Sequence, residues 1–405
     1  MTVPFFRPEI RAEEEAEVLA VLRSGWLTTG PRVRHFEEAF AEAVGAQHAV
    51  AVNSATAALH LAVEALDLGE GSQRRAVLVP TMTFAATAEV VRYMNAVPIL
   101  VDCDAATLNI DFADAERKLA QAQSGHIPGI GAVDVVGIIP VHVGGAMVDL
   151  DQLREFSAAH DLWTVEDAAH AFPAAWRRTA DDDWTRCGSN TSAITCFSFY
   201  ANKTITTGEG GMAVTSNRLL AERMRLMSLH GLSRDAWNRY RGVGSWDYQI
   251  VAPGFKYNLT DISAALGVHQ LRRANAMRGA REAIAQRYTQ HFRSIAEIEL
   301  PALLDNRLHA WHLYPIRLNL DKLKIGRNLF IDKLQKSGIG CSVHWRPLHL
   351  HPYYRVTFGW MPEDFPVASR EWERLISLPL FPSMTDDEQE LVIETVTSIC
   401  SSNRA

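Results

Sequence analysis

The chain has 405 residues, 47% of them hydrophobic and 21% charged, which is enough for two domains with a large core. Its net charge is −7, no basic block occurs, and no apolar run reaches the roughly 18 residues of a membrane span, so neither a nucleic-acid partner nor a membrane is expected. The chain turns acidic near its start, where a secretory signal would be apolar, and its five cysteines are scattered, so we expect a cytoplasmic protein with reduced thiols.

The hydrophobic periodicity predicts helices that alternate with strands. Helices are expected over 8–23 and 33–44, and a short strand at 49–52 turns directly into a further helix. Strands follow near 76–80, 97–102, 135–142, 162–167, 193–199 and 212–216, with helices near 84–95, 111–122 and 149–160. This alternation predicts an α/β fold with a mostly parallel sheet and helices on both faces. Right-handed crossovers place the carboxyl ends of the parallel strands at one edge, where a shared site is expected.

Small residues connect the first strand to its helix, in the sequence Asn53-Ser54-Ala55-Thr56. Backbone amides and hydroxyl groups at such a helix N-terminus favour an anion, so this turn is a candidate phosphate site. The alternative is that Ser54 or Thr56 only caps the helix. No Walker or dinucleotide-binding pattern accompanies the turn.

Two further strands deliver side chains to the same edge. Asp167 ends the strand at 162–167, where a carboxylate can hold the ring nitrogen of pyridoxal phosphate, although it could also be a helix cap or a surface acid. His170 follows and could bind the phenolate oxygen of that cofactor or be packed. Phe84 lies just past the strand at 76–80 and could stack on a flat ring or belong to the core.

The strand at 193–199 leads through Ser198 to Lys203 and a glycine-rich turn. A lysine amine at this edge can form a Schiff base with a carbonyl, including the aldehyde of pyridoxal phosphate. A solvated surface lysine is the ordinary alternative, and the stretches around Ser54 and Asp167 favour the chemical interpretation.

The character of the chain changes near Ala274, where an arginine-rich helix begins after the helix expected at 262–271. We expect a domain boundary there, followed by a smaller α+β domain with strands near 311–318 and 340–346. A loop in that domain carries His344, Arg346, His349 and His351. It matches no metal motif, so no metal is predicted, and an anion contact or a structural role remains open. The segment 232–253, rich in Arg, Trp and Tyr, could cover a site or a partner subunit.

Taken together, these stretches resemble the pyridoxal-phosphate-dependent sugar aminotransferases of the DegT/StrS type. The resemblance spans nearly the whole chain. It rests on Ser-Gly-Trp-Leu-Thr-Thr-Gly-Pro at 24–31, Ser-Ala-Thr-Ala at 54–57, Glu-Asp-Ala-Ala-His at 166–170, Ser-Phe-Tyr-Ala-Asn-Lys-Thr-Ile-Thr-Thr-Gly-Glu-Gly-Gly at 198–211, Pro-Gly-Phe-Lys-Tyr-Asn-Leu-Thr-Asp at 253–261, His-Ala-Trp-His-Leu at 309–313 and Ser-Leu-Pro-Leu-Phe-Pro at 377–382. Within the family the chain looks most similar to the group that makes UDP-4-amino-4-deoxy-L-arabinose.

The resemblance implies the aminotransferase fold of type I, with a large cofactor-binding domain at 1–273 and a small domain at 274–405, on which the N-terminal helix is expected to pack. It makes Lys203 the catalytic, cofactor-linked residue and gives Asp167, His170 and Phe84 the roles described above. The remaining implied contacts are a phosphate site made by Ser54, Ala55, Thr56 and Ser198, an Asn258 that reaches the phosphate of a partner subunit, and substrate contacts from Thr28, Lys256 and His344.

The implied reaction is transamination, with L-glutamate as donor and 2-oxoglutarate as its product. The implied acceptor is a nucleotide-linked keto-sugar, aminated at carbon 4, and the implied assembly is a homodimer with shared active sites. A dehydratase on the same scaffold is one alternative, which Lys203 disfavours because family members of that kind carry histidine there. A non-catalytic sensor of cofactor or nucleotide sugar is the other.

Overall fold

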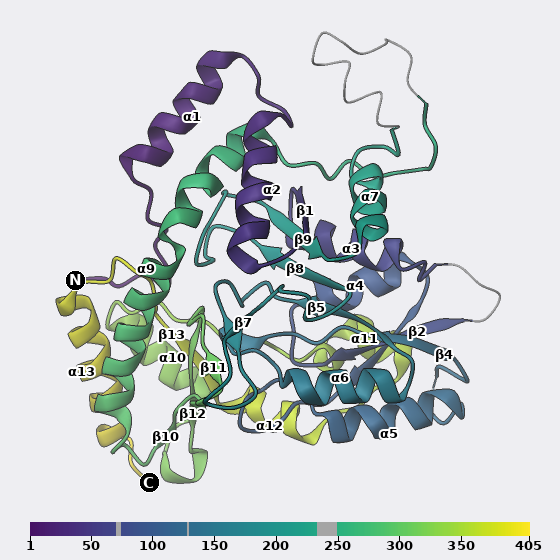
Figure 1. The fold of residues 1–405 in the computed structure, drawn as a ribbon. Helices are drawn as coiled ribbons and strands as arrows, with labels where there is room; N and C mark the ends of the chain where they lie inside the picture. Colours follow the sequence, from purple (N-terminus) through teal and green to yellow (C-terminus); the bar gives the residue numbers. More distant parts are fainter. Residues whose placement is uncertain (70–73, 128, 233–248) are drawn as a thin grey trace.

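The computed structural model describes residues 1–405 except 70–73, 128 and 233–248. A central seven-stranded sheet, with helices on both faces, forms the larger part of the molecule (Figure 1). In spatial order its strands are β1 (His48–Val52), β9 (Gly211–Thr215), β8 (Ile194–Ser198), β5 (Trp163–Asp167), β4 (Asp134–Ile138), β2 (Arg75–Pro80) and β3 (Val97–Val101). Only β9 runs antiparallel to its neighbours, which confirms the mostly parallel sheet.

The strands are apolar runs buried along most of their length, as their place inside the sheet requires. The connecting helices begin at capping side chains: Ser54 for α3 (Ala55–Ala65), Asp111 for α5 (Phe112–Gln123), Asp149 for α6 (Leu150–Ala159) and Asn217 for α7 (Arg218–Met227). α4 (Ala86–Tyr93) follows β2 without such a cap. α2 (Pro31–Val44) starts at a proline and packs Phe36 and Phe40 against aromatic rings of and beside β8.

The longest element is α9 (Asp261–Phe292), with 32 residues. The sequence predicted that this helix stops near Leu271, but it continues because helix-forming residues carry on and present a buried face as far as Phe292. The expected boundary between residues 273 and 274 therefore lies inside one uninterrupted helix. The division into two domains at this point stays a prediction.

The rest of the C-terminal part contains a small antiparallel sheet of β10 (Ile298–Glu299), β12 (Tyr314–Leu318) and β13 (Leu375–Leu378). The helices of this part are α10 (Arg327–Lys336), α11 (Pro352–Phe358), α12 (Pro366–Arg374) and α13 (Asp386–Ser402); α11 packs against α4, where Arg92 Nε donates to Tyr353 Oη at 3.2 Å. The strand predicted near 340–346 is wrong, since this stretch pairs only through an isolated bridge between Ser342 and Ser377. A third sheet joins β6 (Ala175–Trp176), β7 (Thr185–Arg186) and β11 (Arg307–Leu308).

α1 (Ala12–Ser24) lies against the first half of α9, where Arg273 pairs with Glu14 at 2.5 Å and with Glu9 at 2.9 Å. The segment before α1 makes the contacts with the C-terminal part: Phe5 stacks on His344 with ring centroids 5.5 Å apart, and Arg7 pairs with Glu388 at 2.8 Å. The N-terminal residues thus contact both the first half of α9 and the C-terminal part of the chain.

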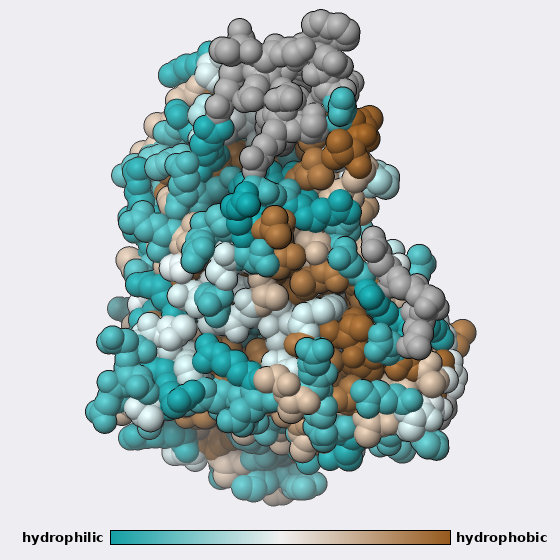
Figure 2. All heavy atoms as spheres, turned by 45° about the vertical axis from the view of Figure 1, so that its right-hand side comes forward, coloured by the Kyte–Doolittle hydropathy of each residue, from teal (hydrophilic) through white to brown (hydrophobic). Residues whose placement is uncertain are grey.

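Most of the surface seen in Figure 2 is hydrophilic, with a band of hydrophobic atoms below the grey residues. In Figure 1, α4 and α7 lie on the side that Figure 2 brings forward. Among the described residues, no helix has both the length and the hydropathy needed to cross a membrane. The five cysteines are free. Most of the segment 232–253 lies outside the described residues.

Candidate active site

The phosphate-binding residues predicted from the sequence come together at the end of three strands. Ser198, the last residue of β8, pairs with Gly211 at the start of β9. A Cβ placed on Gly211 would lie 2.5 Å from the carbonyl carbon of Ser54 and 2.7 Å from the amide nitrogen of Ala55. The absence of a side chain at Gly211 therefore lets β9 lie directly against the turn before α3.

The N-terminus of α3 keeps amide groups free in this turn. Ser54 Oγ accepts a hydrogen bond from the amide of Ala57 at 3.1 Å, so Ser54 caps α3; its phosphate contact stays a prediction. The amides of Ala55 and Thr56 belong to the first turn and have no partner within the helix. A helix N-terminus with two free amides, beside the hydroxyl of Ser198, has the donors that a phosphate group needs.

Asp167 ends β5 as predicted and is 4% exposed. Its Oδ2 accepts from Thr87 Oγ1 at 2.8 Å, and its Oδ1 accepts from the amide of Ala169 at 3.1 Å. Burial raises the pKa of this carboxyl group, while the two hydrogen bonds work to lower it. A buried carboxylate held in this way can bind and stabilise a protonated ring nitrogen.

Lys203 lies in the turn after β8, where its amide donates to the carbonyl of Tyr200 at 3.0 Å. Its Nζ lies 3.5 Å from Nε2 of His312, a weak contact for an ammonium group. Burial lowers the pKa of Lys203 to about 7; the charge of Asp167 works to raise it, and that of Arg281 lowers it further. With this pKa about half of the Lys203 side chains are neutral at pH 7, and a neutral amine is a nucleophile.

His312, the contact of this amine, belongs to a cluster of three imidazole rings and an indole. The ring centroids of His170 and His312 are 4.1 Å apart, and His170 stacks on Trp345 at 4.9 Å with an interplanar angle of 18°. The centroid of His344 lies 6.3 Å from that of His170. Burial lowers the pKa of His344 to about 4 and the pKa values of His170 and His312 well below their usual range, so the rings are neutral at pH 7.

Phe84 is 63% exposed, so it does not belong to the core. The amide of Thr87 donates to the carbonyl of Phe84 at 3.3 Å, and the hydroxyl of Thr87 is the one that binds Asp167. Residues 84–87 thus connect the exposed ring of Phe84 to Thr87, whose hydroxyl binds the carboxylate of Asp167. This arrangement suits a flat ring that is stacked on Phe84 while its nitrogen meets Asp167.

The structure places three predicted residues in a separate group. Asn258 Nδ2 donates to Thr29 Oγ1 at 2.7 Å, Lys256 Nζ donates to Asn258 Oδ1, and the carbonyl of Thr28 accepts from the amide of Asp261 at 3.1 Å. Asn258 lines a cavity of about 970 Å³ beside β1. No hydrogen bond or ring contact within the described residues joins this group to Lys203 or Asp167.

The histidine loop divides between the site and the core. His344 faces the site, whereas buried His349 bonds to Thr81 Oγ1 at 2.7 Å and to Ser369 Oγ at 2.9 Å, a structural role. His351 Nε2 donates to the carbonyl of Arg346 at 3.3 Å. The histidines of this loop thus bind different partners, so they do not form one anion site.

The residue-level prediction did not single out His312, Trp345, Thr87 or Arg281. His312 belongs to the motif His-Ala-Trp-His-Leu at 309–313, which was used only for the resemblance and which lies just before β12. Thr87 and Arg281 lie inside regular helices, where nothing local marks them.

The donor set fits pyridoxal phosphate. The amine of Lys203, which has one weak contact, can react with the aldehyde of this cofactor. The hydrogen-bonded carboxylate of Asp167 can bind the ring nitrogen, and the N-terminus of α3 can bind the phosphate. Nδ1 of His312 is buried without a partner among the described residues, and an exposed aromatic ring stands beside the carboxylate.

Comparisons with known proteins agree with this site. The chain is 42% identical over 398 residues to the spore coat polysaccharide biosynthesis protein SpsC of Bacillus subtilis, a match that covers 98% of this chain and 97% of SpsC. The structure of Spr1654 from Streptococcus pneumoniae in its PLP form superposes with a TM-score of 0.85 at 31% identity over 99% of both chains. PseC of Helicobacter pylori, an aminotransferase of pseudoaminic acid biosynthesis, gives a TM-score of 0.87 at 26% identity over 99% of this chain and 100% of PseC.

Residues 8–397 match the sequence model of the DegT/DnrJ/EryC1/StrS aminotransferase family. This match takes in nearly the whole chain, including every residue of the site described above. The chain belongs to this family and is a pyridoxal-phosphate-dependent sugar aminotransferase.

Proposed function

We propose that the protein transfers an amino group from L-glutamate to carbon 4 of a nucleotide-linked keto-sugar. One observation carries this proposal: the amine of Lys203 is partly buried beside neutral imidazole rings, and the charge of Asp167 acts on its pKa. The similarity to SpsC and PseC supports an amino-sugar product for a surface polysaccharide or glycan. Carbon 4 and the nucleotide rest on the sequence resemblance to the arabinose group.

The cofactor, when bound, supplies an aldehyde that captures amines and a ring that accepts the electron pair released at the donor carbon. Lys203 holds the cofactor and then, as a free amine, moves a proton between the donor's α-carbon and the C4′ atom of the cofactor. Asp167 keeps the ring nitrogen protonated. Ala55, Thr56 and Ser198 hold the phosphate.

His170 can donate one hydrogen bond to the cofactor's phenolate oxygen. Its Nδ1 accepts from the amide of Gly144 at 3.3 Å, so in the neutral ring the proton is on Nε2. The neutral state of His344 and His312 gives the substrate side of the site polar groups without charge. Such neutral polar side chains can form hydrogen bonds with the hydroxyl and keto groups of a sugar ring.

The assembly we propose is a homodimer in which Asn258 serves the site of the partner subunit. Its place beside Lys256, in the cavity next to β1, supports this role. Mixing the Lys203→Arg and Asn258→Ala variants tests it, because in a mixed dimer with shared sites both defects fall in one site and the other site is intact. The mixture should recover up to about a quarter of wild-type activity. Activity of the mixture no higher than that of the separate variants would contradict the shared site.

The test of the reaction is a spectral titration of the purified protein loaded with cofactor. Glutamate should remove the visible absorption band of the Lys203-linked cofactor, and one member of a panel of 4-keto nucleotide sugars should restore it. If glutamate removes the band and no sugar restores it, the proposed acceptor is wrong. If no such band forms with added cofactor, the role of Lys203 is wrong.

A further inference from the structure

A short turn beside the active site holds two segments at once. This turn is η1 (Val143–Gly145), which follows β4. The amide of Gly144 donates to Nδ1 of His170 at 3.3 Å, and the carbonyl of Gly144 accepts from the amide of Leu313 at 3.1 Å. The turn therefore contacts one imidazole directly and fixes the backbone next to the other, His312.

The adjacent glycine strengthens the second connection. The carbonyl of Gly145 accepts from the amide of Ala310 at 2.9 Å, so two backbone hydrogen bonds hold the segment 310–313. A Cβ on Gly145 would lie 3.0 Å from the Cβ of Ala310, which shows how closely the two segments approach. A shift of η1 would thus move His312, whose Nε2 lies 3.5 Å from Nζ of Lys203.

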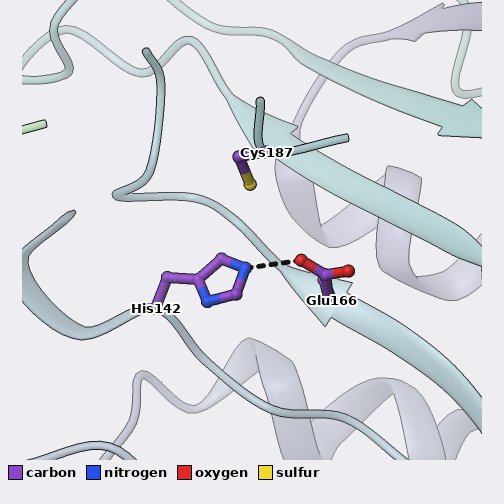
Figure 3. A group of neighbouring side chains, drawn as sticks. All are labelled: His142, Glu166 and Cys187. Carbon is purple, nitrogen blue, oxygen red and sulfur yellow. Dashed lines mark hydrogen bonds and ion pairs between the residues drawn. The ribbon is translucent and has the colours of Figure 1, made fainter. Parts of the chain in front are cut away.

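Directly before this turn, a buried pair anchors it to the sheet (Figure 3). His142 Nε2 lies 2.7 Å from Oε2 of Glu166, and both side chains are 0% exposed. The amide of Val148 donates to Nδ1 of His142 at 3.1 Å, so Nδ1 carries a lone pair and Nε2 carries the proton that is donated to Glu166. His142 is therefore neutral and bonded at both ring nitrogens.

The pair also fixes the strand that carries Asp167. The amide of His142 donates to the carbonyl of Asp167 at 3.2 Å, and the amide of Asp167 donates to the carbonyl of Pro140 at 2.9 Å. Glu166 and Asp167 are neighbours on β5, so their side chains lie on opposite faces of the sheet. One face carries Asp167, and on the other Glu166 binds His142, the residue directly before η1.

The same residues could suggest a metal site, because ligand atoms of His142, Glu166 and Cys187 all lie within 4.8 Å of one another. The hydrogen bonding disfavours this interpretation. A metal ion needs the lone pair of an imidazole nitrogen, but Nε2 carries a proton and Nδ1 already accepts one from the backbone. Burial also raises the pKa of the Cys187 thiol well above its usual range, which disfavours the thiolate that a metal would bind.

We propose that His142 and Glu166 are positioning residues of the transaminase: their hydrogen bond fixes η1, and η1 sets the tautomer of His170 and the place of His312 beside Lys203. The proposal rests on the proposed function for its catalytic consequence. Its structural part, the control of the His170 tautomer, can be tested without any turnover.

The experiment compares Glu166→Leu, which removes the acceptor, with Glu166→Gln, whose amide oxygen can still accept from His142. In cofactor-free protein labelled with ¹⁵N-histidine, wild type and Glu166→Gln should show Nδ1 of His170 unprotonated and Nε2 protonated. Glu166→Leu should show a mixture of both tautomers. Glu166→Asp, which retracts the carboxylate by one methylene, provides the same test if the leucine variant does not fold.

The catalytic part is read from the half-reaction with glutamate. In Glu166→Leu its rate should fall about tenfold or more, while the cofactor dissociation constant stays within about threefold, because Asp167 and the phosphate contacts remain. Glu166→Gln should recover most of the rate. A loss of cofactor affinity equal to the loss of rate would overturn the proposal, since the damage would then lie at Asp167.

Two other results would also overturn it. One is an unchanged His170 tautomer in a folded Glu166→Leu protein. The other is stoichiometric binding of added Zn²⁺ that shifts Nε2 of His142. If the tautomer responds but no variant, nor the wild type, transaminates, then the positioning role stands and the proposed function is the part that fails.

Discussion

The lowered pKa of Lys203 can be measured directly in the cofactor-free protein. Its ordinary value is 10.5, and in this site it is about 7. At pH 7 about half of the Lys203 side chains should be neutral amines, against about one in 3,000 for a lysine with the ordinary value. Lys203 should therefore react with an amine reagent over a thousandfold faster than its ordinary pKa allows, at equal nucleophilicity of the free amine.

Competitive labelling with trace acetic anhydride, followed by mass spectrometry of the peptide that contains residue 203, gives this titration. Labelling should rise with a midpoint near pH 7 and then level off. Free Nα-acetyl-lysine in the same tube provides the reference, and its labelling should keep rising. A midpoint for Lys203 near pH 10 would refute the reasoning that burial controls this amine.

Asp167→Asn tests the sign of the electrostatic contribution. The carboxylate attracts the ammonium form and so raises the pKa of Lys203; its removal should move the labelling midpoint to lower pH. Thr87→Val is the matched control, because it removes one hydrogen bond to Asp167 and keeps the charge. An upward movement in Asp167→Asn would contradict the proposed arrangement of charges.

Three further variants test other parts of the site. Lys203→Arg should abolish turnover while some cofactor stays bound, measured by activity and by the absorbance of the bound cofactor. Phe84→Ala should weaken cofactor binding by about 1 kcal/mol in a fluorescence titration, with the melting temperature of cofactor-free protein unchanged because the ring is exposed, and Phe84→Tyr should bind normally. Gly211→Ala should lower the free energy of unfolding by about 2 kcal/mol or more because its Cβ would collide with Ser54, whereas Gly279→Ala, where a Cβ would meet nothing within 4 Å, should not. A Gly211→Ala protein as stable as wild type would show that β9 can move away from the turn at no cost.

The sequence alone was sufficient for the central sheet and for the groups that end its strands. Short apolar runs, separated by helical segments, predicted all seven strands of the central sheet. Parallel strands are buried on both faces and therefore need such continuous apolar runs. Asp167, Ser198 and Ser54 follow such runs, and the topology then brings them to one edge. Their positions could be derived because a strand end is a local feature.

Contacts between distant segments could not be derived in the same way. Thr87 binds Asp167 across 80 positions, and His312 lies beside Lys203 across 109. The strand expected near 340–346 was wrong because those residues pair with a neighbour only at Ser342. Periodicity reports whether a segment has an apolar face, but it does not report which other segment covers it.

The distribution of charge around Lys203 is compatible with the two substrates proposed for this site. His170, His312 and His344 are all neutral, so near this amine the described side chains offer one negative group, Asp167, and a buried positive one, Arg281. In the proposed site Asp167 binds the ring nitrogen of the cofactor, and Arg281 Nη1 donates to the carbonyl oxygen of Leu380 at 2.7 Å. Neutral imidazoles can donate to or accept from either an amino acid or a sugar without requiring a charge on it. In the proposed site the phosphate of the cofactor binds apart from these rings, at the N-terminus of α3, so the proposed donor and acceptor would meet the same neutral imidazoles.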